Sequence, residues 1–334
     1  MTPRRSPPRS HRIGILGLGM HVPTKVLTNH DLARIVDTSD EWIHSRTGIR
    51  ERRVAPPGTS CSDLAVEAGR EALRQARIDP KDLELLIVAT TTPDMLFPST
   101  SCLVQKRLGA MSAVCFDLSA ACSGSVFAII TAQQYLLTGR YRNALVIGAE
   151  VISSFIDWTD RSTCVLFGDG AGACVLGPVA RGGILATDMG CDGSAAELLT
   201  MPGGGSRHPP SHQSVDQRLH FLRMNGGEIF KLAVRRMADS ATRVMQDGKV
   251  KPDHVECFIP HQANIRIIEA VAKWAHLPIE KVYMNLQRYG NTSAASNLIG
   301  LYEAVQEERI TRNSHVVLVA FGAGLTWGSI LLQW

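Results

Sequence analysis

Residues 107–129 read RLGAMSAVCFDLSAACSGSVFAI, and residues 275–300 repeat their pattern as AHLPIEKVYMNLQRYGNTSAASNLIG. In each segment an apolar run is followed by a loop of small residues and then by an apolar helical pattern. Two further pairs lie at a similar spacing, about half of the 334-residue chain: LELLIVATTTPD (83–94) with VECFIPHQAN (255–264), and NALVIGAE (143–150) with HVVLVAFGAG (315–324). Three pairs in the same order predict two duplicated halves that meet at a pseudo-twofold axis.

Short β-branched runs alternate with helical patterns along the chain, which indicates an α/β fold. Ser60 and Asp63 have the spacing of a capping box, so a helix should begin there and end near Ala76. The helix expected at 123–137 is apolar on most faces, which is typical of a helix in the centre of a fold. Strands are expected at 13–18, 85–89, 114–118 and 144–149.

The formal net charge of +4 comes from the N-terminal tail, because residues 1–12 hold Arg4, Arg5, Arg9 and Arg12 and no acid. The remaining chain is neutral in sum, so we expect no nucleic-acid partner. No apolar run approaches the ~18 residues of a membrane span, and no secretion signal follows the arginines. We therefore predict a cytoplasmic enzyme with a disordered tail (1–12), an N-terminal half (13–181) and a C-terminal half (182–334).

The eight cysteines include no C-x-x-C pair. A chain of this length needs no disulfides, so we expect buried, reduced thiols at seven of the eight positions and no metal site. The glycine-rich segments GLGM (17–20) and GDGAGA (168–173) do not indicate dinucleotide binding. The first lacks the third spaced glycine and a later acidic residue, and the second precedes an apolar strand rather than a helix.

Three residues are candidates for chemistry. Cys122 lies between a strand and the start of the apolar helix, where the helix dipole favours a thiolate; a buried structural cysteine is the alternative. His261 follows a strand in FIPHQAN, and otherwise would cap the next helix. Asn291 lies within a residue or two of the position equivalent to Cys122, and otherwise would be an N-cap. Duplicated halves would bring these loops together, and a thiol nucleophile would then face two groups able to hold a carbonyl oxygen.

Six motifs in this order resemble those of the β-ketoacyl-acyl carrier protein synthase III family. They are DEWIHSRTGIRERR (40–53), DLSAACSG (117–124), DRSTCVLFGDGAGA (160–173), PHQAN (260–264), YGNTSAAS (289–296) and FGAGLTWGS (321–329). The resemblance spans residues 12–334. It implies the five-layered αβαβα thiolase-like fold and the condensation that initiates fatty-acid synthesis from an acyl-CoA primer and malonyl-acyl carrier protein.

The resemblance also implies roles for individual residues. Cys122 would be the acyl-accepting nucleophile of a ping-pong reaction, with the backbone N–H of Cys122 and of Ala323 or Gly324 as oxyanion donors. His261 and Asn291 would promote decarboxylation. At the third position elongating ketoacyl synthases carry a second histidine and hydroxymethylglutaryl-CoA synthases use an acidic base, so Asn291 favours a synthase III. No cofactor or metal is implied.

Further positions follow the same resemblance. Trp42, Arg46 and Arg161 would hold the CoA adenine, and Asn264 and Gly226 would line the pantetheine tunnel. Phe97 would close the acyl pocket of the neighbouring subunit in a homodimer, and Phe321 would lie near the nucleophile. The carrier protein would dock on Lys231, Arg235, Arg266 and Lys273, and the segment 190–224 would cover the site.

Three alternatives stay open from the sequence. A synthase III-like acyltransferase of secondary metabolism would share the fold. A Cys–His–Asn hydrolase would use the same three residue types in the same chain order as papain-like proteases, although the C-G-S-C-W context of those proteases is missing. A catalytically silent subunit would not need the intact trio.

Overall fold

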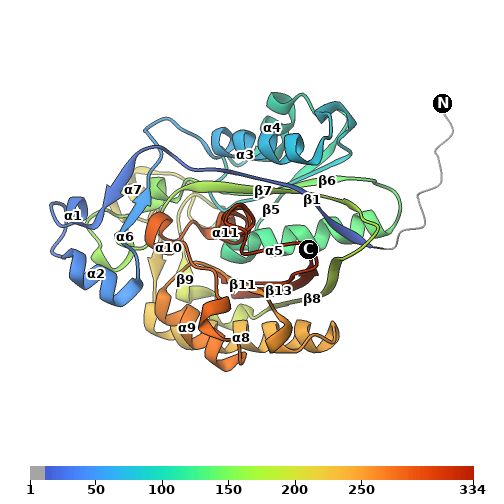
Figure 1. The fold of residues 1–334 in the computed structure, drawn as a ribbon. Helices are drawn as coiled ribbons and strands as arrows, with labels where there is room; N and C mark the ends of the chain where they lie inside the picture. Colours follow the sequence, from blue (N-terminus) through green and yellow to red (C-terminus); the bar gives the residue numbers. More distant parts are fainter. Residues whose placement is uncertain (1–11) are drawn as a thin grey trace.

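The computed structural model describes residues 12–334, so the predicted tail lies outside the described residues apart from Arg12. Two mixed sheets form the body (Figure 1). The first sheet has the order β1 (Ile13–His21), β7 (Gly170–Pro178), β6 (Ala144–Glu150), β4 (Leu85–Ala89), β5 (Val114–Leu118). The second has the order β8 (Gly183–Cys191), β13 (Thr326–Gln333), β12 (His315–Gly322), β11 (Cys257–Pro260).

Four strands of the first sheet have counterparts in the second. In the first sheet β4 runs parallel to β6, while β7 is antiparallel to both β6 and β1. In the second sheet β11 runs parallel to β12, while β13 is antiparallel to both β12 and β8. The predicted duplication is therefore confirmed in the topology.

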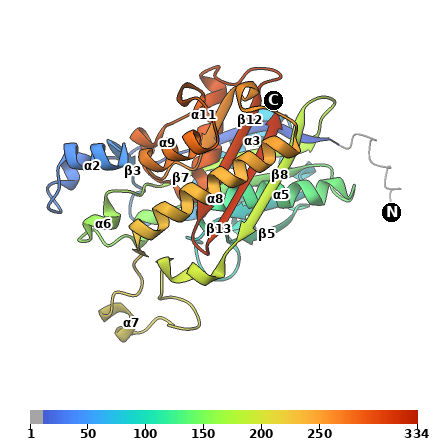
Figure 2. The ribbon, with the colours of Figure 1, turned by 90° about the horizontal axis from the view of Figure 1, so that it is seen from below.

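Helices cover both faces of each sheet. The inner pair, α5 (Gly124–Leu137) and α11 (Ser296–Gln306), lies between the sheets, as Figure 1 shows. The outer helices are α3 (Cys61–Ala76) and α4 (Thr100–Leu108) on the first sheet, and α8 (Gly226–Asp247) and α9 (Ile265–Trp274) on the second (Figures 1 and 2). This arrangement confirms the five-layered αβαβα fold.

The second half lacks a full counterpart of β5. At the corresponding edge, β11 has only an isolated parallel bridge between Phe258 and Val282, and the chain continues into α10 (Leu286–Tyr289). The sequence similarity of 107–129 to 275–300 therefore extends over a region in which only the first half forms a full strand, β5. One sheet has five strands and the other has four.

Local sequence explains why these elements form. The Asp63 carboxylate accepts a hydrogen bond from Ser60 N–H at 2.7 Å, and α3 ends at Ala76 as predicted. Strands β4 and β6 are buried along their whole length, which is typical of parallel strands covered by helices on both faces. A Cβ at Gly19 would lie 2.1 Å from Ala68 O. Gly19, the second glycine of GLGM, therefore allows β1 to approach α3 closely.

Shorter elements gather on one side of the layered body (Figures 1 and 2). They are β2 (Val26–Thr28), α1 (Asn29–Leu32), α2 (Asp40–Thr47), β3 (Glu51–Arg53), α6 (Arg161–Cys164), β9 (Leu199–Thr200), α7 (His212–Asp216) and β10 (Arg223–Met224). Within residues 12–334, no helix combines the length and apolar character that a membrane span requires.

The prediction of seven buried thiols is wrong for three of the cysteines. Cys191 is exposed at the end of the edge strand β8, and Cys102 and Cys115 are half-buried beside the edge strand β5. An apolar run at a sheet edge does not guarantee burial, because an edge strand lacks a neighbour on one side.

Candidate active site

Two cavities meet at Cys122. The first, about 140 Å³, is lined by Cys122, His261 and Asn291 together with apolar side chains of α8 and α9. The second, about 130 Å³, is lined by Cys122, Ser293 and Ala323 together with a mainly apolar wall. The structure thus brings the three predicted residues together around one space, and the thiol is shared by both cavities.

Cys122 lies in the 3₁₀ turn η2 (Ala121–Ser123) directly before α5, and 7% of it is exposed. Ala121 has a left-handed φ of 47°, which is uncommon for a residue other than glycine. A Cβ at position 322 would lie 2.6 Å from Cys122 N, so only glycine fits against the nucleophile there. The turn therefore holds the thiol rigidly at the wall between the cavities.

The thiol is not a ready thiolate. Burial raises the pKa of Cys122 to about 12, although the nearby Ser293 hydroxyl acts in the opposite direction. The sequence predicts that the helix N-terminus favours a thiolate, but lost hydration is the largest influence on the pKa of this buried thiol and favours its neutral form. The proton on Cys122 must therefore be removed during the reaction.

His261 is buried, and both its backbone N–H and its ring are hydrogen-bonded. Its backbone N–H donates to Val319 O at 2.7 Å, and its Nδ1 lies 2.6 Å from the Ser296 hydroxyl. Burial lowers the pKa of His261 to about 4, so the ring is neutral at pH 7. The alternative that it caps the next helix is wrong, because Asn264 caps α9 by accepting from Arg266 N–H at 2.8 Å.

The burial of His261 predicts how the stability of the folded chain depends on pH. The pKa of His261 is about 4 in the folded chain against 6.5 for the ordinary side chain, so the unfolded chain protonates first as the pH falls. The His261 contribution is complete above about pH 6.5 and is lost toward pH 4, a change of about 3 kcal/mol. Between pH 7.5 and 4.5, urea unfolding should show a smaller loss of stability for His261→Gln than for wild type. His212→Gln, at an exposed histidine, should behave like wild type, and equal losses in all three proteins would contradict the prediction.

Asn291 is fixed through its backbone and its side-chain oxygen. Its N–H donates to Leu166 O at 2.8 Å, and its Oδ1 accepts from Ser293 N–H at 2.9 Å. The N-cap alternative is wrong, because Thr292 is the N-cap of the turn that follows, and the amide nitrogen of Asn291 stays available to the cavity that Asn291 lines. The position equivalent to Cys122 is Ala294, since the turns η2 and η7 (Ser293–Ala295) correspond. Asn291 therefore precedes that position by three residues rather than one or two.

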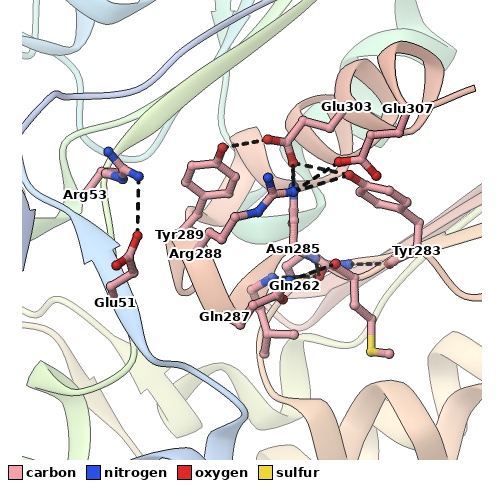
Figure 3. Close-up of polar contacts among 12 residues, drawn as sticks. Glu51, Arg53, Gln262, Tyr283, Asn285, Gln287, Arg288, Tyr289, Glu303 and Glu307 are labelled. Carbon is pink, nitrogen blue, oxygen red and sulfur yellow. Dashed lines mark hydrogen bonds and ion pairs between the residues drawn. The ribbon is translucent and has the colours of Figure 1, made fainter. Parts of the chain in front are cut away.

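A polar network that the sequence analysis missed connects the two loops (Figure 3). Gln262 accepts from Asn285 N–H at 3.0 Å and donates to Pro260 O at 2.7 Å. Glu303, on α11, accepts from Asn285 Nδ2 at 2.8 Å and from the Tyr289 hydroxyl at 2.6 Å. The network joins the segment before His261 to the segment before Asn291. A glutamate within the apolar pattern of 296–306 was the available signal.

The proposed adenine-binding residues are close together. The Arg46 and Arg161 guanidinium carbons each lie 4.8 Å from the centre of the Trp42 ring. Asn264 Nδ2 donates to Arg46 O at 3.0 Å, and Asn264 and Gly226 both line the first cavity. Asn264 thus joins the backbone of Arg46 to the cavity that reaches Cys122, although Trp42, Arg46 and Arg161 do not line that cavity.

The remaining predicted positions are more dispersed. Phe321 lines the first cavity, while Phe97 is 85% exposed and lines neither. Ala323 lines the second cavity beside Cys122, and Gly324 lines neither. Lys231 forms an ion pair with Glu228 at 2.9 Å, and Arg235 with Asp239 at 4.0 Å, which reduces the positive charge of α8. Arg266 and Lys273 are exposed on α9.

Only the parts of the segment 190–224 near its two short strands line the site. Leu199, Met201 and Leu222 line the second cavity, and Met224 lines the first. The other apolar lining of the second cavity includes Phe155, which the sequence analysis did not select. Among residues 12–334, no cluster of histidine, cysteine, aspartate and glutamate is arranged to hold a metal ion.

Comparison with known proteins identifies the family. Models of the N-terminal part and the C-terminal part of 3-oxoacyl-[acyl-carrier-protein (ACP)] synthase III match residues 116–193 and 245–334. A β-ketoacyl-[acyl-carrier-protein] synthase III of Caldanaerobacter subterraneus subsp. tengcongensis is 53% identical, over 96% of this chain and 97% of its own.

Two solved structures are also similar. The 3-oxoacyl-[acyl-carrier-protein] synthase III of Aquifex aeolicus is 48% identical with a TM-score of 0.89, over 96% of this chain and all of its own. The priming β-ketosynthase of the R1128 polyketide pathway is 33% identical with a TM-score of 0.90, over 99% of both chains. The chain therefore belongs to the β-ketoacyl-[acyl-carrier-protein] synthase III family of condensing acyltransferases.

Proposed function

We propose that the chain joins an acyl-CoA primer to malonyl-acyl carrier protein and so begins fatty-acid synthesis in the cytoplasm. The observation that carries this proposal is the position of Cys122 between two cavities. The first holds His261 and Asn291 among apolar side chains of α8 and α9, and the second lacks this pair and is lined mainly by apolar side chains. The acyl chain of the primer would occupy the second cavity, while a thioester carbonyl would meet His261 and Asn291 in the first.

In the first half-reaction Cys122 attacks the primer thioester and CoA leaves. The backbone N–H groups of Cys122 and Ala323 would hold the negative oxygen, because both residues line the second cavity. Trp42, Arg46 and Arg161 would hold the CoA adenine, and Asn264 and Gly226 would guide the pantetheine arm.

In the second half-reaction malonyl-acyl carrier protein occupies the first cavity. The Ser296 hydroxyl lies 2.6 Å from His261 Nδ1. We propose that it donates to this nitrogen, so that the ring proton would lie on Nε2 and face the substrate. Asn291 accepts through Oδ1 and so has its amide nitrogen free to donate. Both groups are therefore donors, and they would stabilise the thioester oxygen as CO2 leaves and the enolate forms. The enolate carbon then attacks the acyl-cysteine and releases the β-ketoacyl product, with no further cofactor.

The acidic carrier protein would approach the surface formed by Lys231, Arg235, Arg266 and Lys273. Because Lys231 and Arg235 already pair with acids of α8, the exposed charges of α9 carry more of this interaction. Charge complementarity of this kind acts mainly on the association rate and weakens with salt.

The direct test supplies the purified full chain with malonyl-acyl carrier protein and a panel of acyl-CoA primers. Formation of β-ketoacyl-carrier protein, CoA and CO2 in equal amounts supports the proposal. Carrier proteins of fatty-acid and polyketide systems should be compared, since preference for the latter would favour a role in secondary metabolism. Hydrolysis of the primer without a carbon–carbon product would overturn the proposal.

The second cavity predicts primer length. Phe155→Ala removes a ring from the apolar wall that lines this cavity. Longer primers should therefore react with a higher kcat/KM. We expect the ratio of kcat/KM for hexanoyl-CoA over acetyl-CoA to rise about tenfold or more. Phe230→Ala is the matched control, because Phe230 lines the first cavity and should leave the ratio unchanged. An unchanged ratio in Phe155→Ala would place the primer elsewhere.

We propose that two copies associate through β5. Within residues 12–334 this strand ends its sheet and pairs only with β4, and Val114 at its start is 49% exposed. The adjacent loop exposes Leu96 by 77% and Phe97 by 85%. An unpaired edge beside exposed apolar side chains favours antiparallel pairing with a second copy, and Phe97 would then reach the partner.

Val114→Lys should dissociate this dimer, because it places a charge at the start of the edge strand. Light scattering after size-exclusion chromatography should report a mass near 36.3 kDa for the variant and twice that mass for wild type. Val215→Lys, at an exposed site on α7, should remain dimeric. A dimeric Val114→Lys protein would contradict pairing at β5.

A further inference from the structure

Glu303 is a buried carboxyl that no step described above uses. It lies on α11 and lines neither of the two cavities. Its carboxylate accepts from the Tyr289 hydroxyl at 2.6 Å, from Asn285 Nδ2 at 2.8 Å and from Arg288 Nη2 at 2.9 Å (Figure 3). A buried carboxylate is costly unless it is hydrogen-bonded. Three donors from the one segment 285–289 therefore indicate that Glu303 holds this segment in place.

The segment that Glu303 holds leads directly to Asn291. Its regular element is α10, which has four residues, and a single helical turn is not stable by itself. Gly290 follows with a left-handed φ of 63°, and a Cβ there would lie 2.7 Å from Leu166 O. The chain before Asn291 therefore depends on side-chain contacts for its position.

Within residues 12–334, side chains rather than a strand ladder hold this segment to the second sheet. In the first half β5 pairs with β4 along its whole length before the chain reaches Cys122. In the second half the corresponding segment has one isolated bridge to β11. Gln262 accepts from Asn285 N–H at 3.0 Å, next to the hydrogen bonds that Glu303 accepts. Gln262 and Glu303 therefore replace the ladder that the second half lacks.

Helix α11 contacts both groups that would face the malonyl thioester, or the chain that carries them. Ser296, its first residue, has its hydroxyl 2.6 Å from His261 Nδ1. Glu303 follows Ser296 by seven residues, which is about two helical turns, so both side chains project from the same face of α11. One helix thus provides the partner of the His261 ring and the anchor of the chain before Asn291.

Contacts with the first half do not by themselves fix Asn291 relative to His261. Asn291 N–H donates to Leu166 O at 2.8 Å, and Asn291 O accepts from Gly168 N–H at 3.0 Å. Leu166 and Gly168 belong to the first half, whereas His261 belongs to the second. A contact between the chain that carries Asn291 and the second half is therefore needed, and Glu303 provides it.

We propose that Glu303 is a positioning residue for decarboxylation, which keeps the Asn291 amide beside the His261 ring so that both face one thioester oxygen. This inference rests on the proposed function. Glu303 acts through the segment 285–289 and not on the substrate itself. A displacement of about 1 Å can cost about 100-fold in rate. Loss of this anchor should therefore slow decarboxylation and leave the attack of Cys122 on the primer nearly unchanged.

The test measures the two half-reactions separately in the purified full chain. Glu303→Gln keeps the size of the side chain but places an NH2 group among the three donors. We expect kcat for the release of labelled CO2 from malonyl-acyl carrier protein to fall by about tenfold or more. The KM for malonyl-acyl carrier protein and the rate of Cys122 acylation should stay within about threefold of wild type. Acyl-enzyme mass gives the concentration of active sites, so misfolded protein does not affect the rates.

Two further variants keep the test decisive. Tyr289→Phe removes only the hydroxyl that donates to Glu303. It should show the same selective loss of CO2 release, by about threefold or more, and it decides the question if Glu303→Gln does not fold. Glu307→Gln is the matched control, because Glu307 is exposed one turn beyond Glu303 and pairs with the same Arg288 at 3.5 Å. This control should match wild type in both half-reactions.

A double variant separates positioning from a general loss of structure. In an Asn291→Ala background, Glu303→Gln should lower CO2 release by less than about twofold further, since the group that it positions is gone. An equal fall of both half-reactions in either single variant, wild-type rates in Tyr289→Phe, or an undiminished further loss in the double variant would overturn the inference. Failure of wild type to form an acyl-enzyme and a β-ketoacyl product would instead overturn the proposed function.

Discussion

Replacing Cys122 by alanine should abolish acyl-enzyme formation and lower condensation by about 10⁴-fold or more, since the nucleophile is lost. The structure offers no second thiol at this point, because Cys122 is the cysteine that lines the two cavities. Intact-protein mass spectrometry with a primer acyl-CoA should show the added acyl mass on wild type and none on Cys122→Ala. CoA release measured in parallel should also be lost in Cys122→Ala.

Cys191→Ala is the matched control, because it removes an exposed thiol that lines neither cavity. It should acquire the acyl mass like wild type. An acyl mass on Cys122→Ala would show that another side chain is the acceptor and would refute the assignment.

His261→Ala and Asn291→Ala should each lower CO2 release from malonyl-acyl carrier protein by about 100-fold or more, which is the effect of losing one oxyanion donor, ~3 kcal/mol. Acylation of Cys122 should remain within about threefold of wild type in both variants, because neither donor is needed for the attack on the primer. The measurement follows labelled CO2 and acyl-enzyme mass separately.

Ser296→Ala provides an intermediate case. It removes the partner of His261 Nδ1 but leaves the imidazole in place, so decarboxylation should fall less than in His261→Ala. If both half-reactions fell together in His261→Ala, the division of labour between Cys122 and the His–Asn pair would be refuted.

The parts of the fold that short-range signals determine could be predicted closely. The strands at 85–89 and 114–118 and the end of the helix at Ala76 agree with the structure, because apolar runs and a capping box mark them. Strand β1 continues to His21, beyond the predicted residue 18, because it pairs with β7 through the glycine-rich segment. The lost fifth strand of the second half depends on pairing between distant segments, which local pattern does not encode.

In the active site, too, short-range motifs could be predicted and contacts between distant segments could not. The motifs selected Cys122, His261 and Asn291, and the structure places all three on one cavity. Glu303 could not be assigned from the sequence, because its importance comes from a hydrogen bond to a residue 18 positions away. The pKa of Cys122 could not be predicted either, because burial, which is a tertiary property, is its largest influence.

The missing strand of the second sheet also bears on assembly size. If both halves had kept an open β5-type edge, each copy would offer two equivalent docking edges on opposite sheets, and copies could add without end into a fibre. The second sheet instead has β11 at this edge, with one isolated bridge between Phe258 and Val282. The proposed pairing through β5 would therefore use one edge of each copy, which gives a closed pair rather than an open polymer.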